Sequence, residues 1–237
     1  MQVQQLDDMD KLSQDNAETV ILSWQRRLVA MAQNPPYVFC DTPQHLIWQF
    51  QQRKTTFAGY SEQDVAEAEV ELGVEFPMLF RTFLRKMAKA PGALFGGFDL
   101  AGIKDFKGFH ADALALLAET DPGLSLPSKA VVFQFLQGYT FSFILATGGF
   151  DGPVMGWMET EKTPAQLAPT FEKMVEAHLR LMESNDRDTR ERGGEYLTLY
   201  PDGGTKTSIP SIASGERPLD IARAGKKWWQ IFHKNVS

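Results

Sequence analysis

Two short amphipathic helices with a tight break between them form the clearest pattern in the chain. The segment from Tyr60 to Leu84 reads YSEQDVAEAEVELGVEFPMLFRTFL. Ser61 followed three residues later by Asp64 is a capping-box pattern, which predicts that the first helix begins there. Gly73 suits a left-handed helix end, and Pro77 suits the first turn of the next helix. Because helices this short are not stable alone, both are expected to pack on a larger body.

Each of these two helices has an apolar stripe at helical spacing, which is the face expected to pack on the rest of the protein. The stripe residues are Val65, Ala68 and Leu72 on the first helix and Phe80, Leu84 and Met87 on the second. Glu69 lies beside the first stripe rather than opposite it. We therefore expect Glu69 to be partly buried and hydrogen-bonded to the backbone.

Farther along the chain, side chains alternate with the two-residue period of β-strands. Three β-branched and aromatic runs, separated by Gly-containing turns, predict strands over 131–135, 139–145 and 153–158. Short turns between successive strands favour an antiparallel meander. Gln134 and Ser142 alternate with phenylalanines in the first two strands, which predicts that one face of the sheet is wetter than the other.

The remaining elements are predicted from weaker signals. Residues 1–14 are expected to be loosely ordered, and a helix to run from about Asp15 to the stop at Asn34-Pro35-Pro36. The other expectations are a helix opening at Thr42-Pro43, short strands and turns over 91–108, a helix over 110–119, a long helix opening at Thr163-Pro164, an exposed loop over 185–195, a strand over 196–200, a turn over 201–204 and a final helix over 219–232.

Composition and charge limit the class of protein. The chain has 237 residues, of which 43% are hydrophobic and 23% charged, as in ordinary soluble globular proteins. The formal net charge of −6 argues against general nucleic-acid binding, which draws its affinity from cationic groups. Cys40 is the only cysteine, so neither an intramolecular disulfide nor a cysteine-based zinc site is possible. The polar, acidic N-terminus is unlike a signal peptide, and no apolar run is long enough to span a membrane. We therefore expect a cytoplasmic protein.

Residue chemistry alone identifies no active site. The chain contains neither a G-x-G-x-x-G nor a P-loop pattern, and no G-x-S-x-G. The four histidines are scattered without ligand spacing, so we expect no metal and no cofactor. One enzymatic hypothesis stays open. Asp99 with Asp105 and Lys107 faintly resembles the carboxylate and lysine arrangement of metal-dependent nucleases, and His178 is a further candidate.

One predicted surface feature is concentrated on one side of a helix, and it is acidic. Glu62, Asp64, Glu67, Glu69, Glu71 and Glu75 fall within fourteen residues that contain no Lys or Arg. Asp64, Glu67 and Glu71 share a helix face that points away from the apolar stripe. This face is either simply solvated or a docking patch that steers a basic partner. In the second interpretation the contacts include Glu62, Asp64, Glu67 and Glu71.

A basic and aromatic run, Lys226-Lys227-Trp228-Trp229, lies near the C-terminus. In one interpretation Trp228, Ile231 and Phe232 dock a terminal helix on the body while the lysines stay in solvent. In the other, the run binds nucleic acid or a membrane. The acidic charge of the whole chain favours docking.

At these motifs the chain resembles the SUKH superfamily, which contains fungal cell-wall-assembly regulators and many bacterial toxin-immunity proteins. The resemblance depends on an E-x-x-L-G-x-x-[LF]-P signature, here Glu69 to Pro77, followed by a helix of the family's Y-x-x-F-L type at Phe80 to Leu84. A P-V-x-x-W-like strand follows at Pro153 to Trp157. The order and spacing of these pieces fit the family from about Phe57 to Leu181.

The resemblance implies an α+β fold, with a largely antiparallel sheet flanked by helices and no catalytic residues. It divides the chain into a helical N-terminal extension (1–56), a SUKH-like domain (57–184) and a mixed C-terminal extension on the same body (185–237). The signature residues with an expected structural role are Glu69, Leu72, Gly73, Pro77 and Trp157.

For function, the resemblance suggests a non-enzymatic protein-binding domain, most specifically an immunity-type protein that neutralises a toxin, often a nuclease. The acidic patch fits a basic toxin domain as the partner, because a basic cleft is covered best by a negative surface. A regulatory scaffold of the same fold is an alternative, and an enzyme using Asp99, Asp105 and Lys107 is the alternative from another class. The partner's identity and the oligomeric state stay open.

Overall fold

The computed structural model describes residues 2–33, 54–96, 98–136, 138–159, 161–191, 196–199 and 205–208. These residues form an α+β fold. Its elements in chain order are α1 (Gln2–Gln33), β1 (Phe57–Ala58), α3 (Glu62–Leu72), α4 (Met78–Lys86), β2 (Ala90–Pro91), β3 (Asp99–Leu100), α5 (Phe106–Thr120), β4 (Ala130–Leu136), β5 (Thr140–Leu145), β6 (Val154–Met158), β7 (Ala165–Ala168), α6 (Phe171–Glu191), β8 (Tyr196–Leu199) and β9 (Thr205–Ser208).

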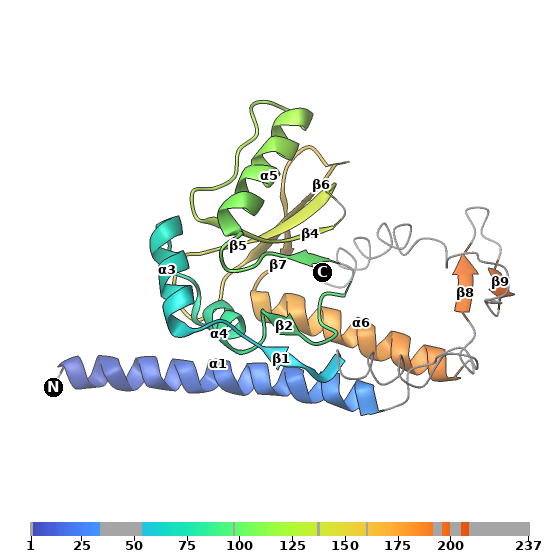
Figure 1. The fold of residues 1–237 in the computed structure, drawn as a ribbon, viewed down its shortest axis with the longest axis horizontal. Coiled ribbons are helices and arrows are strands. Elements are labelled where there is room, and N and C mark those ends of the chain that lie inside the picture. Colours follow the sequence, from blue (N-terminus) through green and yellow to red (C-terminus); the bar gives the residue numbers. More distant parts are fainter. Residues whose placement is uncertain are drawn as a thin grey trace.

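The main sheet is an antiparallel meander of five strands in the order β3-β4-β5-β6-β7. The predicted strands and their antiparallel order are therefore confirmed for β4, β5 and β6. Helix α5 covers one face of the sheet, and α4 and α6 lie on the side of the other face (Figure 1). Two small pairs, β1 with β2 and β8 with β9, are also antiparallel.

The two predicted helices of the opening motif are α3 and α4. Ser61 and Asp64 form the reciprocal capping box at the start of α3. Gly73 ends that helix at φ 65°, and the N–H groups of Gly73 and Val74 bond to the carbonyls of Val70 and Glu69. This pair of bonds is a Schellman motif, which satisfies the last carbonyls of the helix. Both ends of α3 are therefore fixed by local sequence.

Both faces of the sheet are dry, so the prediction of one wetter face is wrong. Strands β4 and β5 are buried at nearly every position, and Gln134 and Ser142 are 5% and 2% exposed. The physical reason is that helices lie on both sides of the sheet. Ala113 and Leu117 of α5 pack on one face. The alternation of polar and aromatic residues therefore marks two buried faces with different side chains, and not one buried face and one solvent-exposed face.

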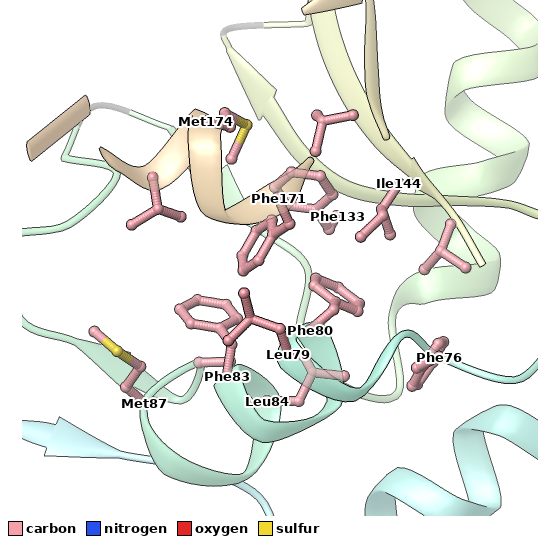
Figure 2. Packing of buried hydrophobic residues seen from close by; sticks show 14 of the residues in the cluster. Phe76, Leu79, Phe80, Phe83, Leu84, Met87, Phe133, Ile144, Phe171 and Met174 are labelled. Atoms are coloured by element: carbon pink, nitrogen blue, oxygen red, sulfur yellow. The ribbon is translucent and has the colours of Figure 1, made fainter. Parts of the chain in front are cut away.

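Phe80 of α4 lies at the centre of the larger core (Figure 2). Its ring makes an edge contact with Phe171, the first residue of α6, at a centroid distance of 5.2 Å. It also contacts Phe133 of β4 at 5.7 Å and Phe76 at 5.6 Å. Each such aromatic pair contributes about 0.5–1.5 kcal/mol beyond burial. One side chain thus connects α4, α6 and the sheet.

Helix α1 begins at Gln2, so the prediction of a loosely ordered stretch before Asp15 is wrong. The helix expected from about Asp15 is confirmed, and its side chains Trp24 and Leu28 are fully buried. Trp24 Nε1 donates to Glu176 at 3.0 Å, and Arg27 forms a bidentate pair with Glu183 at 2.7 and 2.9 Å. These contacts attach α1 to α6, while α1 also packs along α4.

The region after β6 also differs from the prediction. Residues 165–168 form strand β7, and the helix predicted to open at Thr163-Pro164 begins at Phe171. Asp151, in the turn between β5 and β6, accepts hydrogen bonds from the N–H groups of Phe171 and Glu172, at 3.0 Å each. The cap thus comes from 20 residues upstream, where a local pattern does not show it. Helix α6 continues to Glu191, so the prediction of a loop over 185–195 is wrong for residues 185–191.

Other sequence predictions have mixed outcomes. Helix α5 begins four residues earlier than expected, at Phe106, and the strand predicted at 196–200 is found as β8. The helix expected after Thr42-Pro43, the turn over 201–204 and the helix over 219–232 lie outside the described residues, as do Cys40 and Trp228. Across the described ranges, no helix combines the length and the hydropathy that crossing a membrane requires.

The cap on α6 leads to a stability prediction. Asp151→Ala removes the acceptor of the Glu172 N–H and one of the two acceptors of the Phe171 N–H, which also bonds to the carbonyl of Gly152. We therefore expect a loss of about 1–2 kcal/mol in the free energy of unfolding. Asp121→Ala is the matched control, because that carboxylate accepts one exposed hydrogen bond from Gly123. Chemical denaturation measures both. Equal stability of the two variants would contradict the assigned cap.

Candidate partner-binding surface on helix α3

Glu69 attaches helix α3 to the start of α4. Its Oε1 accepts a hydrogen bond from the N–H of Phe76 at 2.9 Å, and its Oε2 lies 3.3 Å from Nε of Arg81. Its side chain is 15% exposed. The prediction that Glu69 is partly buried and bonded to the backbone is confirmed. A carboxylate that accepts from both a backbone amide and a guanidinium fixes the turn between the two helices.

The same turn is bonded to the sheet through main-chain groups. The carbonyls of Gly149 and Phe150, between β5 and β6, accept from the N–H groups of Met78 and Leu79 at 2.8 and 2.9 Å. Gly148 N–H donates to the carbonyl of Glu75 at 3.2 Å. The first N–H groups of a helix have no partner within it, so these carbonyls cap α4. The turn that follows α3 is therefore hydrogen-bonded through its backbone to the turn between β5 and β6.

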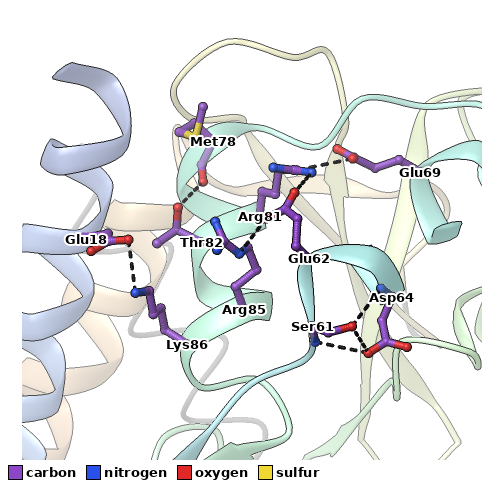
Figure 3. Close-up of polar contacts among 10 residues, drawn as sticks. All are labelled: Glu18, Ser61, Glu62, Asp64, Glu69, Met78, Arg81, Thr82, Arg85 and Lys86. Carbon is purple, nitrogen blue, oxygen red and sulfur yellow. Dashed lines mark hydrogen bonds and ion pairs between the residues drawn. The ribbon is translucent and has the colours of Figure 1, made fainter. Parts of the chain in front are cut away.

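Glu62 does not act as an isolated surface acid. Its carboxylate pairs with the guanidinium groups of both Arg81 and Arg85 on α4, the latter at 2.8 Å (Figure 3). Arg81 at the same time contacts Glu69, so one arginine connects the two carboxylates on the α4 side of α3. The negative charge of Glu62 is thus balanced within the protein.

Glu71 is also paired, because its Oε1 lies 2.9 Å from Nζ of Lys107 on α5. Both side chains are more than half exposed, and an exposed pair of this kind contributes little to stability. The sequence showed no Lys or Arg within the acidic segment. The structure supplies Arg81, Arg85 and Lys107 from neighbouring helices, and no local signal pointed to them.

The remaining two acids carry the negative charge of this surface. Asp64 bonds to Ser61 within the capping box, and its hydrogen bonds with the Ser61 hydroxyl and N–H hold its pKa below the usual value. Glu67 accepts a hydrogen bond from the neutral Gln63 at 2.8 Å. Within the described ranges neither side chain forms an ion pair. Of the four predicted contacts, Asp64 and Glu67 are therefore the two without an ion-pair partner, although the nearby charges of Lys104 and Lys89 also lower the pKa of Asp64.

The residues of the enzymatic alternative fall on different elements. Asp99 lies on β3, Asp105 precedes α5, and Lys107 pairs with Glu71. His178 lies in α6, where its Nε2 accepts a hydrogen bond from the N–H of Phe95 at 3.3 Å. Burial lowers the pKa of His178 to about 4. In the part of the chain that the structure describes, no three side chains of His, Cys, Asp or Glu are grouped to hold a metal ion.

The other signature residues have packing or turn roles. Trp157 is 1% exposed, stacks on Phe141 at a centroid distance of 5.5 Å, and donates through Nε1 to the carbonyl of Glu161 at 3.1 Å. Leu72 packs against the larger core, and Pro77 directly precedes the first residue of α4. Trp157 thus packs in the smaller core, and Leu72 and Pro77 lie at the junction of α3 and α4; none of them forms part of the exposed face of α3.

A comparison with protein-family models identifies the family to which this fold belongs. A family model described as SUKH_5, SMI1-KNR4 cell-wall, matches residues 44–180, which is more than half of the chain. The chain belongs to this SUKH family. The match includes α3, α4, the main sheet and the first half of α6, and it leaves α1 outside. A search of curated proteins found no match.

The Glu69 contacts of the SUKH framework lead to a graded stability prediction. Glu69→Ala leaves the N–H of Phe76 without its acceptor, so we expect a loss of about 1–3 kcal/mol in unfolding free energy. Glu69→Gln keeps an acceptor oxygen and is expected to cost less. Glu67→Ala, on the exposed face, is the control with almost no effect. The account of Glu69 is wrong if denaturation gives the three variants equal stability.

His178 leads to a pH prediction. Because its folded pKa is depressed to about 4 from the usual 6.5, the unfolded chain binds this proton first. The stabilisation is complete above pH 6.5 and is lost as the pH falls towards 4, by up to on the order of 3 kcal/mol. Relative to His178→Gln, the wild type should lose stability over that window in urea titrations. Parallel curves for the two proteins would contradict a buried, neutral His178.

Proposed function

We propose that this protein is a non-enzymatic protein-binding domain of the immunity type, which binds and neutralises a toxin through the exposed face of α3. The observation that carries the proposal is a pair of carboxylates without an ion-pair partner among the described residues, Asp64 and Glu67, on a helix whose two ends are both fixed. Membership of the SUKH family supports a binding role.

Rigidity favours α3 as a recognition element. Its start is closed by the capping box of Ser61, its end by the Schellman motif at Gly73, and its following turn by Glu69. A surface that is already ordered loses little conformational entropy when it binds. An exposed carboxylate on such a helix, as at Glu67, can therefore contribute most of its interaction energy to a partner.

Charge defines the class of partner. Uncompensated carboxylates attract a surface rich in Lys and Arg, such as the substrate cleft of a toxin that acts on nucleic acid. The paired acids Glu62 and Glu71 flank this surface. Because exposed ion pairs are weak, the cations of a partner are able to replace Lys107 at Glu71. The proposed partner is thus a basic toxin domain.

Association kinetics test the surface. The probe is the purified product of the gene immediately upstream, and the variant is Glu67→Lys. Reversing an uncompensated charge should slow association by about three- to tenfold at low salt and reduce its salt dependence. Glu119→Lys, an exposed acid at the end of α5, is the control with equal charge change and a smaller effect.

Two results would contradict the proposal at different levels. If Glu67→Lys and Glu119→Lys associate at the same rate, α3 is not the binding surface. If the wild-type protein neither binds the upstream gene product nor protects cells that express it, the immunity function is wrong.

A further inference from the structure

Val70 is the most exposed large hydrophobic side chain in the part of the chain that the structure describes. Its exposed fraction is 83%, and the others of this kind are Leu12 at 62%, Leu22 at 48%, Phe150 at 37% and Leu114 at 36%. Single apolar side chains are common on protein surfaces, so exposure alone gives Val70 no role. Its position on α3 distinguishes it from the other four.

Val70 lies on the side of α3 that faces solvent. At about 100° per residue, it is about 140° around the helix from Val65 and about 160° from Ala68, the two buried residues of α3. Glu67, one turn earlier, is an exposed neighbour on the same side. One turn later, a Cβ placed on the exposed Gly73 would meet no atom of a more distant residue within 4 Å. The surface next to Val70 is therefore open.

Val70 has no packing role among the described residues. It belongs to neither hydrophobic core cluster. Val74 packs against the larger core and supplies the apolar contact that often accompanies a Schellman motif. A β-branched residue also forms helix less readily than alanine or glutamate. A residue that breaks two local rules without a gain in packing is expected at a functional position.

The surroundings of Val70 define what fits against it. Glu67 forms no ion pair among the described residues, and the next residue, Glu71, is paired only with the exposed Lys107. Protein interfaces combine a central apolar side chain with a polar or charged rim. Carboxylates at the rim attract cations, whereas the apolar side chain needs an apolar contact. The surface therefore fits a basic protein that presents an apolar contact between its cations.

We propose that Val70 is the apolar anchor of the α3 binding surface, and that the partner covers it with an apolar contact flanked by Lys or Arg. This inference rests on the proposed function, because it places the partner on the same face of α3. The two kinds of contact act on different rates. The charge of Glu67 speeds the encounter, and burial of Val70 slows dissociation. The stiff valine side chain also loses little rotamer entropy on burial.

Dissociation kinetics of Val70→Ala test the proposal. The probe is the purified product of the gene immediately upstream, bound to the full-length protein. Removing two methyl groups from a buried anchor should raise the dissociation rate by about fivefold to thirtyfold. The association rate should change by about twofold at most. Because alanine is the better helix former, the urea midpoint of the free variant should equal or exceed that of the wild type.

Two further variants serve as controls. Leu22→Ala removes an exposed apolar side chain from α1, away from the α3 surface, and should dissociate at the wild-type rate. Glu67→Lys should act mainly on the association rate. The proposal thus predicts that the valine and glutamate variants change different rate constants.

The possible failures of the two proposals are distinguishable. If the wild type binds the probe and Val70→Ala dissociates at the wild-type rate, Val70 is not an anchor, while the proposed binding function stands. A lower urea midpoint for Val70→Ala would also overturn the inference, because Val70 would then contribute to packing. If the wild type does not bind the probe, the proposed function is wrong, and the inference is wrong with it.

Discussion

The structure depends on one contact, between the turn that joins α3 to α4 and the turn that joins β5 to β6. Main-chain carbonyls of Gly149 and Phe150 cap α4, and the side chain of Asp151 caps α6. A Cβ on Gly152 would lie 2.8 Å from a backbone oxygen and 3.1 Å from Pro77, so close packing here requires glycine. The eight residues between β5 and β6 thus supply acceptors for N-terminal N–H groups of two helices. This arrangement brings Phe80 and Phe171, from α4 and α6, into contact at the centre of the core.

A framework fixed in this way explains how a short helix can be ordered enough for the binding role that we propose. Helix α3 is 11 residues long, which is marginal for an isolated helix. Its stability comes from Val65 in the core, from its two caps and from Glu69. The acids that help to attach the helix, Glu62 and Glu69, are neutralised by arginines, whereas Asp64 and Glu67 are not. Attachment and the proposed recognition thus fall on two sides of one helix.

The sequence predicted the features that depend on neighbouring residues. The capping box of Ser61 and Asp64, the left-handed Gly73 and the buried carboxylate of Glu69 all follow from spacing within a few residues. The features that it missed depend on distant partners. Asp151 caps α6 from 20 residues away, and Arg85 and Lys107 neutralise Glu62 and Glu71 from other helices. The early start of α1 was missed because a polar, acidic segment has no strong helical stripe.

Native-state amide hydrogen exchange tests the central contact most directly. The N–H groups of Met78, Leu79 and Phe171 bond to the turn between β5 and β6. If that contact holds the two helices and the sheet as one unit, all three amides should exchange only through global unfolding, with the same free energy as the core of β5. If they exchange through local opening, well below the global free energy of unfolding, while β5 stays protected, the contact is not what holds the fold together.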